Sequence, residues 1–269
     1  MSLRTEGLIA AIASHVHGEN LSLSLLKDQL LPDGYEPNTV LDRYSSEVRE
    51  SFKNPGRLVL FNMNDFVEGP DFRHWEEYSK PCMMLLHGRT AITNRDYSWL
   101  SPAVFGLIER CRVQDRLVIF HCCHDRVFME QDIAAHVVIS SLVYQLLIAK
   151  SSILRSQPRF EELRRKFADS SWCVSSAKVA FAVLGELLDM FPEVYILLDR
   201  IDRIKGDADR FMDPLVNLVE HSRGTIKVFL VASSNNQDLP EGKMTPDLLE
   251  NIADRLGAER FSSLILNQK

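Results

Sequence analysis

The sequence predicts an α/β fold in which a parallel five-stranded sheet follows an N-terminal helical leader. From residue 81 onward, short apolar runs alternate with longer helical patterns, which is typical of parallel strands joined by helical crossovers. The apolar runs show little polar alternation, so the strands are expected to be buried on both faces. The five predicted strands cover residues 83–86, 117–120, 194–198, 226–232 and 263–266.

The third predicted strand carries the strongest indication of a site. It lies in residues 194–204, VYILLDRIDRI, and leads into two acids, Asp199 and Asp202. Ligands of open parallel sheets bind beyond the carboxyl ends of the strands, where an Asp commonly holds hydrated magnesium beside phosphates. The alternative is an acid that only solvates the strand end. Because a strand-end acid of either kind is expected to be partly exposed, Asp199→Ala is predicted to leave folding nearly intact.

The leader precedes the sheet and has the pattern of short helices. Residues 4–17 and 20–30 have the periodicity of two amphipathic helices, and a third helix is predicted to end at the Asn-Pro-Gly of residues 54–56. The apolar face of the third helix consists of Leu41, Tyr44, Val48 and Phe52. We assign residues 1–70 to the leader and residues 71–269 to the sheet domain.

The apolar face of the leader can pack either on the sheet domain or on another chain. The second possibility predicts self-association or docking of a protein partner. Deleting residues 1–56 is then expected to leave a folded fragment with altered mass in solution or altered partner binding.

Helix boundaries are indicated by three pairs of residues that end in proline. Ser101-Pro102, Asp213-Pro214 and Thr245-Pro246 each place an N-cap residue before a proline at the first helical position. Gly257 is expected to close the last of these helices. The apolar stretch at residues 134–149 contains His136 and several polar residues, so it predicts a core helix rather than a membrane span.

Composition places the chain among globular proteins. Hydrophobic residues make up 45% and charged residues 25%, and the net charge is −6. Without a basic excess, we expect no nucleic-acid partner, and without a long apolar stretch we expect no membrane association. The five cysteines are an odd number and lie mostly in apolar runs, which favours reduced thiols and an intracellular protein, cytoplasmic or nuclear.

Residues 121–124, His-Cys-Cys-His, have the residue types of a zinc site but not its spacing. Adjacent residues on a strand point to opposite faces, and zinc motifs usually separate their ligands by two or more residues. We therefore interpret these side chains as core residues, and we expect no cysteine catalysis because neither thiol has a visible partner.

In combination, these stretches resemble the NACHT-type nucleotide-binding domain of signal-transduction (STAND) ATPases, particularly the nephrocystin-3-like N-terminal version common in fungal proteins. The similarity covers about residues 72–269 and is carried by motifs in a characteristic order. They are Phe72 and Trp75, a glycine after the first strand (Gly88), VIFHCCH at 118–124, SSLVYQLL at 140–147, VYILLDRIDRI and KVFLVASS at 227–234. The resemblance implies a three-layer P-loop-NTPase-like fold with strand order 5-1-4-3-2.

The phosphate-binding loop departs from the family pattern. Such a loop needs glycines, a lysine that reaches the terminal phosphates, and a hydroxyl for the metal. Here the segment is GRTAITNRDYSWLSP, in which Gly88 and Ser98 remain but the second glycine and the lysine are missing. Arg89 or Arg95 could replace the lysine, although the neighbouring Asp96 opposes phosphate.

The acids and the fourth strand depart as well. Asp199 and Asp202 remain as candidate magnesium ligands, but Arg203 stands where the resemblance implies a Glu. After the fourth strand, the family's arginine is replaced by a stretch that includes Ser233. Phosphoryl transfer depends mainly on positioning and charge stabilisation, so losing a lysine, an acid and an arginine predicts a pseudo-ATPase.

These departures favour a degenerate NACHT-like signalling or scaffold module that acts through protein contacts and requires no cofactor. The alternative is an active NTPase that binds ATP or ADP with magnesium through an arginine. A further possibility is that the chain is the N-terminal piece of a longer receptor.

Overall fold

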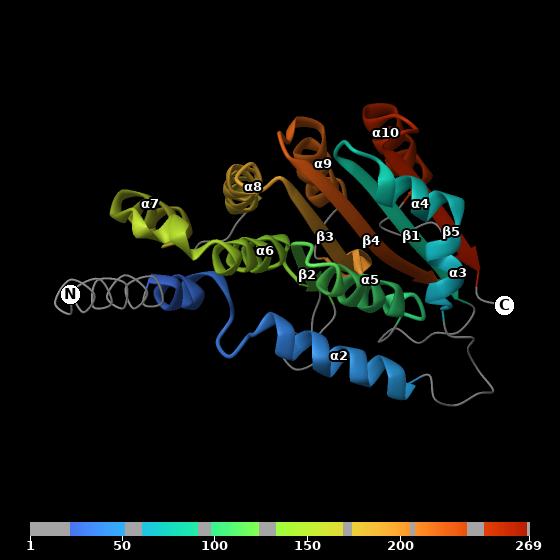
Figure 1. Ribbon diagram of the computed structural model, residues 1–269, viewed down its shortest axis with the longest axis horizontal. Helices are drawn as coiled ribbons and strands as arrows, with labels where there is room; N and C mark the ends of the chain where they lie inside the picture. The colour runs from blue at the N-terminus through green and yellow to red at the C-terminus, as the bar shows by residue number, and fades with distance from the viewer. Residues whose placement is uncertain are drawn as a thin grey trace, which may run out of the picture.

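The computed structural model describes residues 22–51, 61–90, 98–123, 133–168, 174–204, 208–235 and 245–267. Five parallel strands form one sheet in the order β2-β3-β4-β1-β5, which is the expected order 5-1-4-3-2 counted from the other edge (Figure 1). The strands are β1 (Cys82–Thr90), β2 (Val118–Cys122), β3 (Glu193–Asp199), β4 (Thr225–Asn235) and β5 (Phe261–Asn267). Fold class and strand positions are therefore confirmed.

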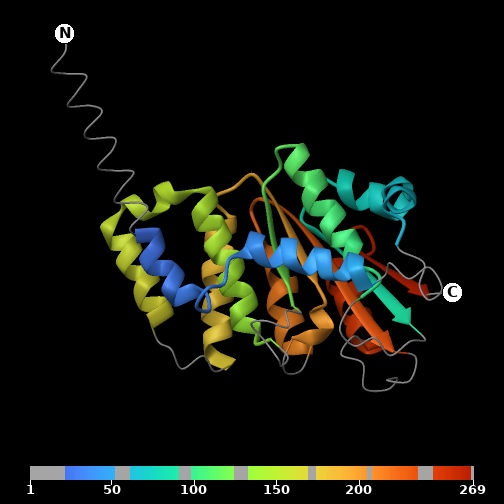
Figure 2. The same ribbon diagram turned by 90° about the horizontal axis from the view of Figure 1, so that it is seen from below.

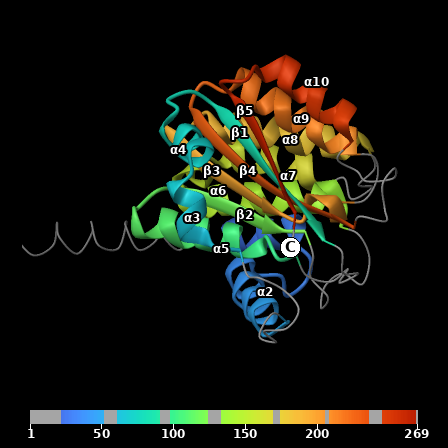
Figure 3. The same cartoon turned by 90° about the vertical axis from the view of Figure 1, so that its right-hand side faces the viewer.

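Helices cover both faces of the sheet and make three layers. One face packs against α6 (Ala135–Ala149), α8 (Val174–Leu188), α9 (Ala208–His221) and α10 (Pro246–Leu256). The other packs against α2 (Pro37–Ser51), α3 (Met63–Glu68), α4 (Pro70–Glu77) and α5 (Ser101–Val113). Figure 3 shows α9 and α10 on one side of the sheet and α3 and α5 on the other. The short helices η1 (Ser151–Arg155) and η2 (Ile201–Arg203) and the helix α7 (Gln157–Ala168) complete the elements.

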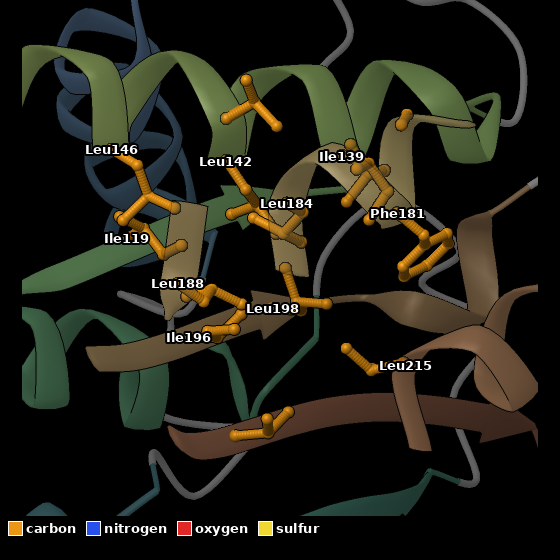
Figure 4. Packing of buried hydrophobic residues seen from close by; sticks show 14 of the residues in the cluster. Ile119, Ile139, Leu142, Leu146, Phe181, Leu184, Leu188, Ile196, Leu198 and Leu215 are labelled. Atoms are coloured by element: carbon orange, nitrogen blue, oxygen red, sulfur yellow. The ribbon is translucent and has the colours of Figure 1, made fainter. Parts of the chain in front are cut away.

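The larger core lies between the sheet and α6, α8 and α9. Leu142 and Leu184 point from α6 and α8 toward Ile196 and Leu198 of β3, and Leu215 approaches from α9 (Figure 4). Because β3 is apolar on both faces, it requires helices on both sides, as the sequence predicts. The predicted core helix at residues 134–149 is confirmed as α6, and no helix in the described part of the chain is long and apolar enough to span a membrane.

The outer edge of β2 is protected by a side chain. Gln145 of α6 accepts a hydrogen bond from the Phe120 backbone N–H at 3.1 Å and donates one from Nε2 to the Phe120 carbonyl at 2.7 Å. The amide thus makes the two bonds that a further strand would make to this residue.

The leader packs on the sheet domain. Residues 22–30 are helical and bury Leu26 and Leu30 in the larger core, whereas α2 buries Leu41, Tyr44 and Val48 against α5 and β2. These apolar faces are used within the chain, so they are not free to dock another chain as the sequence analysis allows. Removing residues 1–56 would expose the apolar surface of the domain that these side chains cover. Burial of each large apolar side chain contributes about 1.5–3 kcal/mol to the free energy of unfolding, so the fragment would be less stable.

Two of the three predicted helix starts differ from the structure. Leu100, and not Ser101, is the N-cap residue of α5, and Pro214 lies inside α9. The helix α9 begins before Asp213-Pro214 because its buried face includes Phe211 and Met212, whose burial offsets the cost of an interior proline. The third start is confirmed, since Thr245 accepts a hydrogen bond from the Leu248 N–H and Gly257, with φ 76°, closes α10.

The predicted leader helix at residues 4–17 lies outside the described part of the chain, as do Phe52, Arg95 and His124. The boundary at residue 70 stays a prediction.

Candidate functional site

The carboxyl ends of the strands bring most of the predicted site residues to one edge of the sheet. Gly88 of β1 pairs in register with Ser233 of β4, and Asp199 of β3 pairs with Cys122 of β2. Asp202 follows Asp199 in η2, and its carboxylate Oδ1 accepts a hydrogen bond of 3.0 Å from the Ser233 backbone N–H. Asp199, Asp202 and Gly88 therefore lie at the same edge of the sheet, where the strands end.

Asp199 is fully buried, with 0% of its surface exposed, so the expectation of a partly exposed acid is wrong. Tyr44 of α2 and Ser101 of α5 cover it with their hydroxyl groups, which lie 3.2 Å from each other. Both hydroxyls favour the ionised carboxylate, although no hydrogen bond of good geometry joins either carboxylate oxygen to a residue that the structure describes. Asp199 is a buried acid with nearby polar groups but without a defined bond.

Burial raises the pKa of Asp199 to about 6, because the charged form loses its hydration. The Ser101 hydroxyl, the Arg200 guanidinium and the Tyr44 hydroxyl oppose this shift, and the charge of Asp202 adds to it. Burial also raises the pKa of Tyr44 well above its ordinary value, so its hydroxyl stays protonated.

Arg200 occupies the position between the two acids and binds the second one. Its backbone is left-handed, with φ 59° and ψ 47°, a conformation that residues other than glycine adopt rarely. Its guanidinium donates to Asp202 from Nε at 3.0 and 3.1 Å and from Nη2 at 2.8 Å. Burial alone would lower the pKa of Arg200, but the charge and hydrogen bonds of Asp202 raise it, so the guanidinium stays charged.

The sequence analysis overlooked Arg200, although its position in the Asp-Arg-Ile-Asp stretch was a usable signal. A bidentate guanidinium satisfies both oxygens of a carboxylate. Asp202 is therefore engaged by a cation of the protein itself and by the Ser233 N–H.

The segment that corresponds to the phosphate-binding loop is partly described. A Cβ on Gly88 would lie 2.5 Å from Leu100 Cδ1 and 3.2 Å from Trp99 Nε1, so these side chains pack directly on the strand. Ser98 is buried, and its Oγ accepts a hydrogen bond from the Leu100 N–H at 3.2 Å. The backbone of Arg89 lies in β1 opposite Ser234.

The hydroxyl that approaches Asp199 is thus that of Ser101, while the Ser98 hydroxyl accepts from the start of α5. The sequence analysis kept Ser98 as the hydroxyl of this segment and interpreted Ser101 only as a helix cap. As oxygen ligands, Asp199 and Ser101 suit a hard cation such as Mg²⁺, but Asp202 is already paired with Arg200.

The neighbouring histidine and cysteines behave as core residues. His121 Nδ1 lies 3.1 Å from the Tyr35 hydroxyl, and the two rings stack. Burial lowers the pKa of His121 to about 3, so the ring is neutral. Within the described ranges, no three His, Cys, Asp or Glu residues are grouped so that they could hold a metal ion.

The fold is P-loop-NTPase-like, because the parallel sheet has the strand order expected for that class. Two acids follow the carboxyl end of β3, as the class requires of its magnesium site. No family model and no curated relative matches the sequence. Two similar solved structures are Drosophila ORC bound to poly(dA/dT) DNA and Cdc6, and the Aeropyrum pernix ORC1 protein in complex with DNA.

The first similarity has a TM-score of 0.37 and 12% identity and covers 95% of this chain and 32% of that chain. The second has a TM-score of 0.38 and 15% identity and covers 88% and 48%. The chain therefore spans less than half the length of either structure, and similarity at this level carries no argument about its ligands or activity.

One expectation is nevertheless corrected by these structures. The sequence analysis excludes nucleic acid because the chain has no basic excess, whereas both similar proteins are bound to DNA. The exclusion of nucleic acid is therefore withdrawn.

Proposed function

We propose that this domain is a degenerate NACHT-like module that acts as a scaffold or switch through protein contacts and does not hydrolyse nucleotide. The observation that carries the proposal is the ion pair of Arg200 with Asp202. At the carboxyl end of this strand, an active site would use such an acid for magnesium, and here a guanidinium already neutralises it.

The remaining polar groups agree with this proposal. Asp199 is buried beneath Tyr44 and Ser101, and Arg203 stands where the resemblance implies an acid. Trp99 and Leu100 pack on the strand end at Gly88, where a close backbone approach to phosphate would be needed. An intracellular location, cytoplasmic or nuclear, belongs to the same proposal, because Cys82, Cys111, Cys122 and Cys123 are free thiols and buried.

The alternative function is an ATP-binding NTPase in which an arginine replaces the missing lysine. Arg89 and Arg95 are the candidates, and both belong to the segment that follows Gly88. An arginine binds phosphate well, so this alternative requires only that one of the two reaches the nucleotide.

Calorimetric titration and thermal melting with ATP and with ADP, each with magnesium, decide between these functions. We expect no heat of binding and no melting shift in the wild-type protein, and no release of phosphate. A nucleotide present at a hundred times its dissociation constant would stabilise the protein by about 2.7 kcal/mol, which melting detects easily. A magnesium-dependent shift that Arg89→Ala or Arg95→Ala abolishes would overturn the proposal and support the NTPase.

A further inference from the structure

We infer that the outer edge of β5 pairs antiparallel with the same edge of a second copy of this chain, so that two five-stranded sheets join into one. The inference rests on the proposed function and deepens it, because it names the partner and the surface of a module that acts through protein contacts. The pairing would consist of backbone hydrogen bonds and side-chain contacts across the joined strands, which is the mode of recognition that an open strand edge offers.

The two outer strands of the sheet differ in how their free edges are protected. At β2 the amide of Gln145 occupies both backbone groups of Phe120. The strand β5 lies at the other end of the strand order and pairs with β1 alone within the described part of the chain (Figure 1). Figure 2 shows the end of β5, in red, on the side of the molecule away from α6, α7 and α8. An outer strand without such protection is a template for another strand.

The sequence of β5 lacks the features that keep strand edges apart. Its residues, FSSLILN, include no charge and no proline. Ile265 is 47% exposed and Ser263 is exposed as well, so the face of β5 that carries them is accessible. Uncharged apolar side chains at an open edge favour pairing, whereas lysines or inward-pointing charges would oppose it.

The backbone groups of Ser263 and Ile265 point away from β1. The Met83 N–H donates to the Arg260 carbonyl at 2.7 Å, so the backbone groups of the even-numbered residues of β5 face β1. Because successive residues of a strand direct these groups to opposite sides, those of Ser263 and Ile265 face outward. They are the donors and acceptors that a further strand would bond.

The strand is complementary to itself when the twofold axis passes beside Leu264. In this register Ser263 lies opposite the second copy's Ile265, and Ser262 lies opposite its Leu266. Each small polar side chain thus faces a large apolar one, and the two Leu264 side chains face each other. The outward-facing Ser263 and Ile265 then form hydrogen-bonded pairs, and no charge within the strand opposes a like charge.

One blocked edge and one open edge suit a closed pair of chains. A twofold axis uses the β5 edge of both copies, so the joined sheet ends in two β2 strands. Each of these ends carries the Gln145 amide, so a third copy would meet backbone groups that are already bonded. The arrangement therefore favours a second copy as the occupant of the β5 edge and limits the assembly to two chains.

Analytical ultracentrifugation of the full chain over a series of concentrations tests the pairing. We expect the wild type to pass from one chain to two as the concentration rises, without larger species. Ile265→Lys places a lysine on each copy, and the two lysines lie diagonally across the twofold axis, so the dissociation constant should rise about tenfold or more. Val113→Lys, at a position on α5 that is 82% exposed, is the matched control and should dimerise as the wild type does.

A cysteine at the inferred axis tests the register. In Leu264→Cys the two thiols would face each other in a non-hydrogen-bonded pair, where the Cα atoms are about 4.5 Å apart and within the range of a disulfide. Mild oxidation should link two chains in this variant. It should not link Val113→Cys or the wild type, whose described cysteines are buried.

The outcomes separate this inference from the proposed function. A wild type that stays monomeric overturns the inference, and so does a dimer that Ile265→Lys leaves unchanged or that oxidation of Leu264→Cys does not link. Hydrolysis of ATP by the dimer would end the pseudo-ATPase proposal and leave the β5 interface in place. A chain that neither hydrolyses ATP nor dimerises keeps the scaffold proposal and loses the interface.

Discussion

Two charged residues are buried on the same face of the sheet, one near the amino ends of the strands and one at the carboxyl ends. They differ in the hydrogen bonds that their surroundings provide. Lys227, near the start of β4, donates to the Trp75 carbonyl at 2.8 Å and to the Tyr78 carbonyl, with Cys82 Sγ at 3.6 Å. Asp199, at the end of β3, has the Ser101 and Tyr44 hydroxyls nearby but no hydrogen bond of good geometry to any described residue. The charged group at the amino ends of the strands is thus fully hydrogen-bonded, whereas the acid at the carboxyl ends lacks well-formed hydrogen bonds.

Burial alone does not distinguish a structural charged residue from a functional one. Lys227 ties the end of α4 to the sheet and satisfies two carbonyls that the helix leaves unpaired. The Ser101 and Tyr44 hydroxyls and the Arg200 charge favour the ionised form of Asp199, but they offset its loss of hydration only in part. A buried acid compensated only in part is costly, so its presence at the strand end indicates a role other than stability.

The largest effect is expected for Lys227→Met, which keeps the length of the side chain but removes its charge and donors. The Tyr78 carbonyl would lose this donor and the Trp75 carbonyl would keep only the Cys82 thiol at 3.5 Å, so the free energy of unfolding should fall by about 3 to 4 kcal/mol. Urea denaturation measures the loss, and Lys178→Met at an exposed position on α8 serves as the control. A loss below about 1 kcal/mol would remove the contrast between the two edges.

Asp199→Asn is expected to raise the free energy of unfolding rather than lower it. Because burial raises the pKa of Asp199 from 3.8 to about 6, the folded state holds this proton more tightly than the unfolded chain does. The acid therefore costs little stability below about pH 4, the cost grows as pH rises from about 4 to about 6, and it stays constant at higher pH. The Asn variant should be more stable than the wild type by about 3 kcal/mol at pH 8 and nearly equal to it near pH 4.

Melting temperatures of both proteins across this pH range test the prediction. Destabilisation by Asp199→Asn at every pH would show that the carboxylate makes favourable contacts, and the two edges would then be equivalent. This prediction replaces the expectation from sequence that the site tolerates substitution because it is exposed.

A smaller effect is expected for Tyr35→Phe, which removes the hydroxyl that bonds His121. The ring stacking remains, and one buried hydrogen bond is lost, so unfolding should become easier by about 1 kcal/mol. Since His121 is neutral over the ordinary pH range, the loss should not change between pH 5 and pH 8. A pH-dependent loss would mean that His121 titrates and that a second buried group is poorly compensated.

The sequence alone predicts the strands of the sheet, but it does not predict the side chains that surround the acids. The strands were predictable because each is a local apolar run, and the shared edge of Gly88 and Asp199 follows from parallel connectivity. The burial of Asp199 was not predictable, because Tyr44, which covers it, lies more than a hundred residues earlier in the chain. The left-handed backbone of Arg200 also leaves no sign in a stretch of ordinary residues.

The proline inside α9 shows the same limit at a helix boundary. A proline after an aspartate favours a helix start locally, but burial of Phe211 and Met212 moved the start earlier. Tertiary contacts determine both the burial of Asp199 and the start of α9, and neither contact can be recognised from a local sequence pattern.

The amide of Gln145 has a consequence for the behaviour of the protein at high concentration. An outer strand with open backbone groups can recruit identical strands from other molecules and start a growing fibre. At Phe120 this ladder is already terminated by a side chain, so an incoming strand would have to break two hydrogen bonds before it gained any. Resistance of this edge to fibrillation is thus encoded in a helix residue, and an assay of aggregation after Gln145→Leu would reveal it.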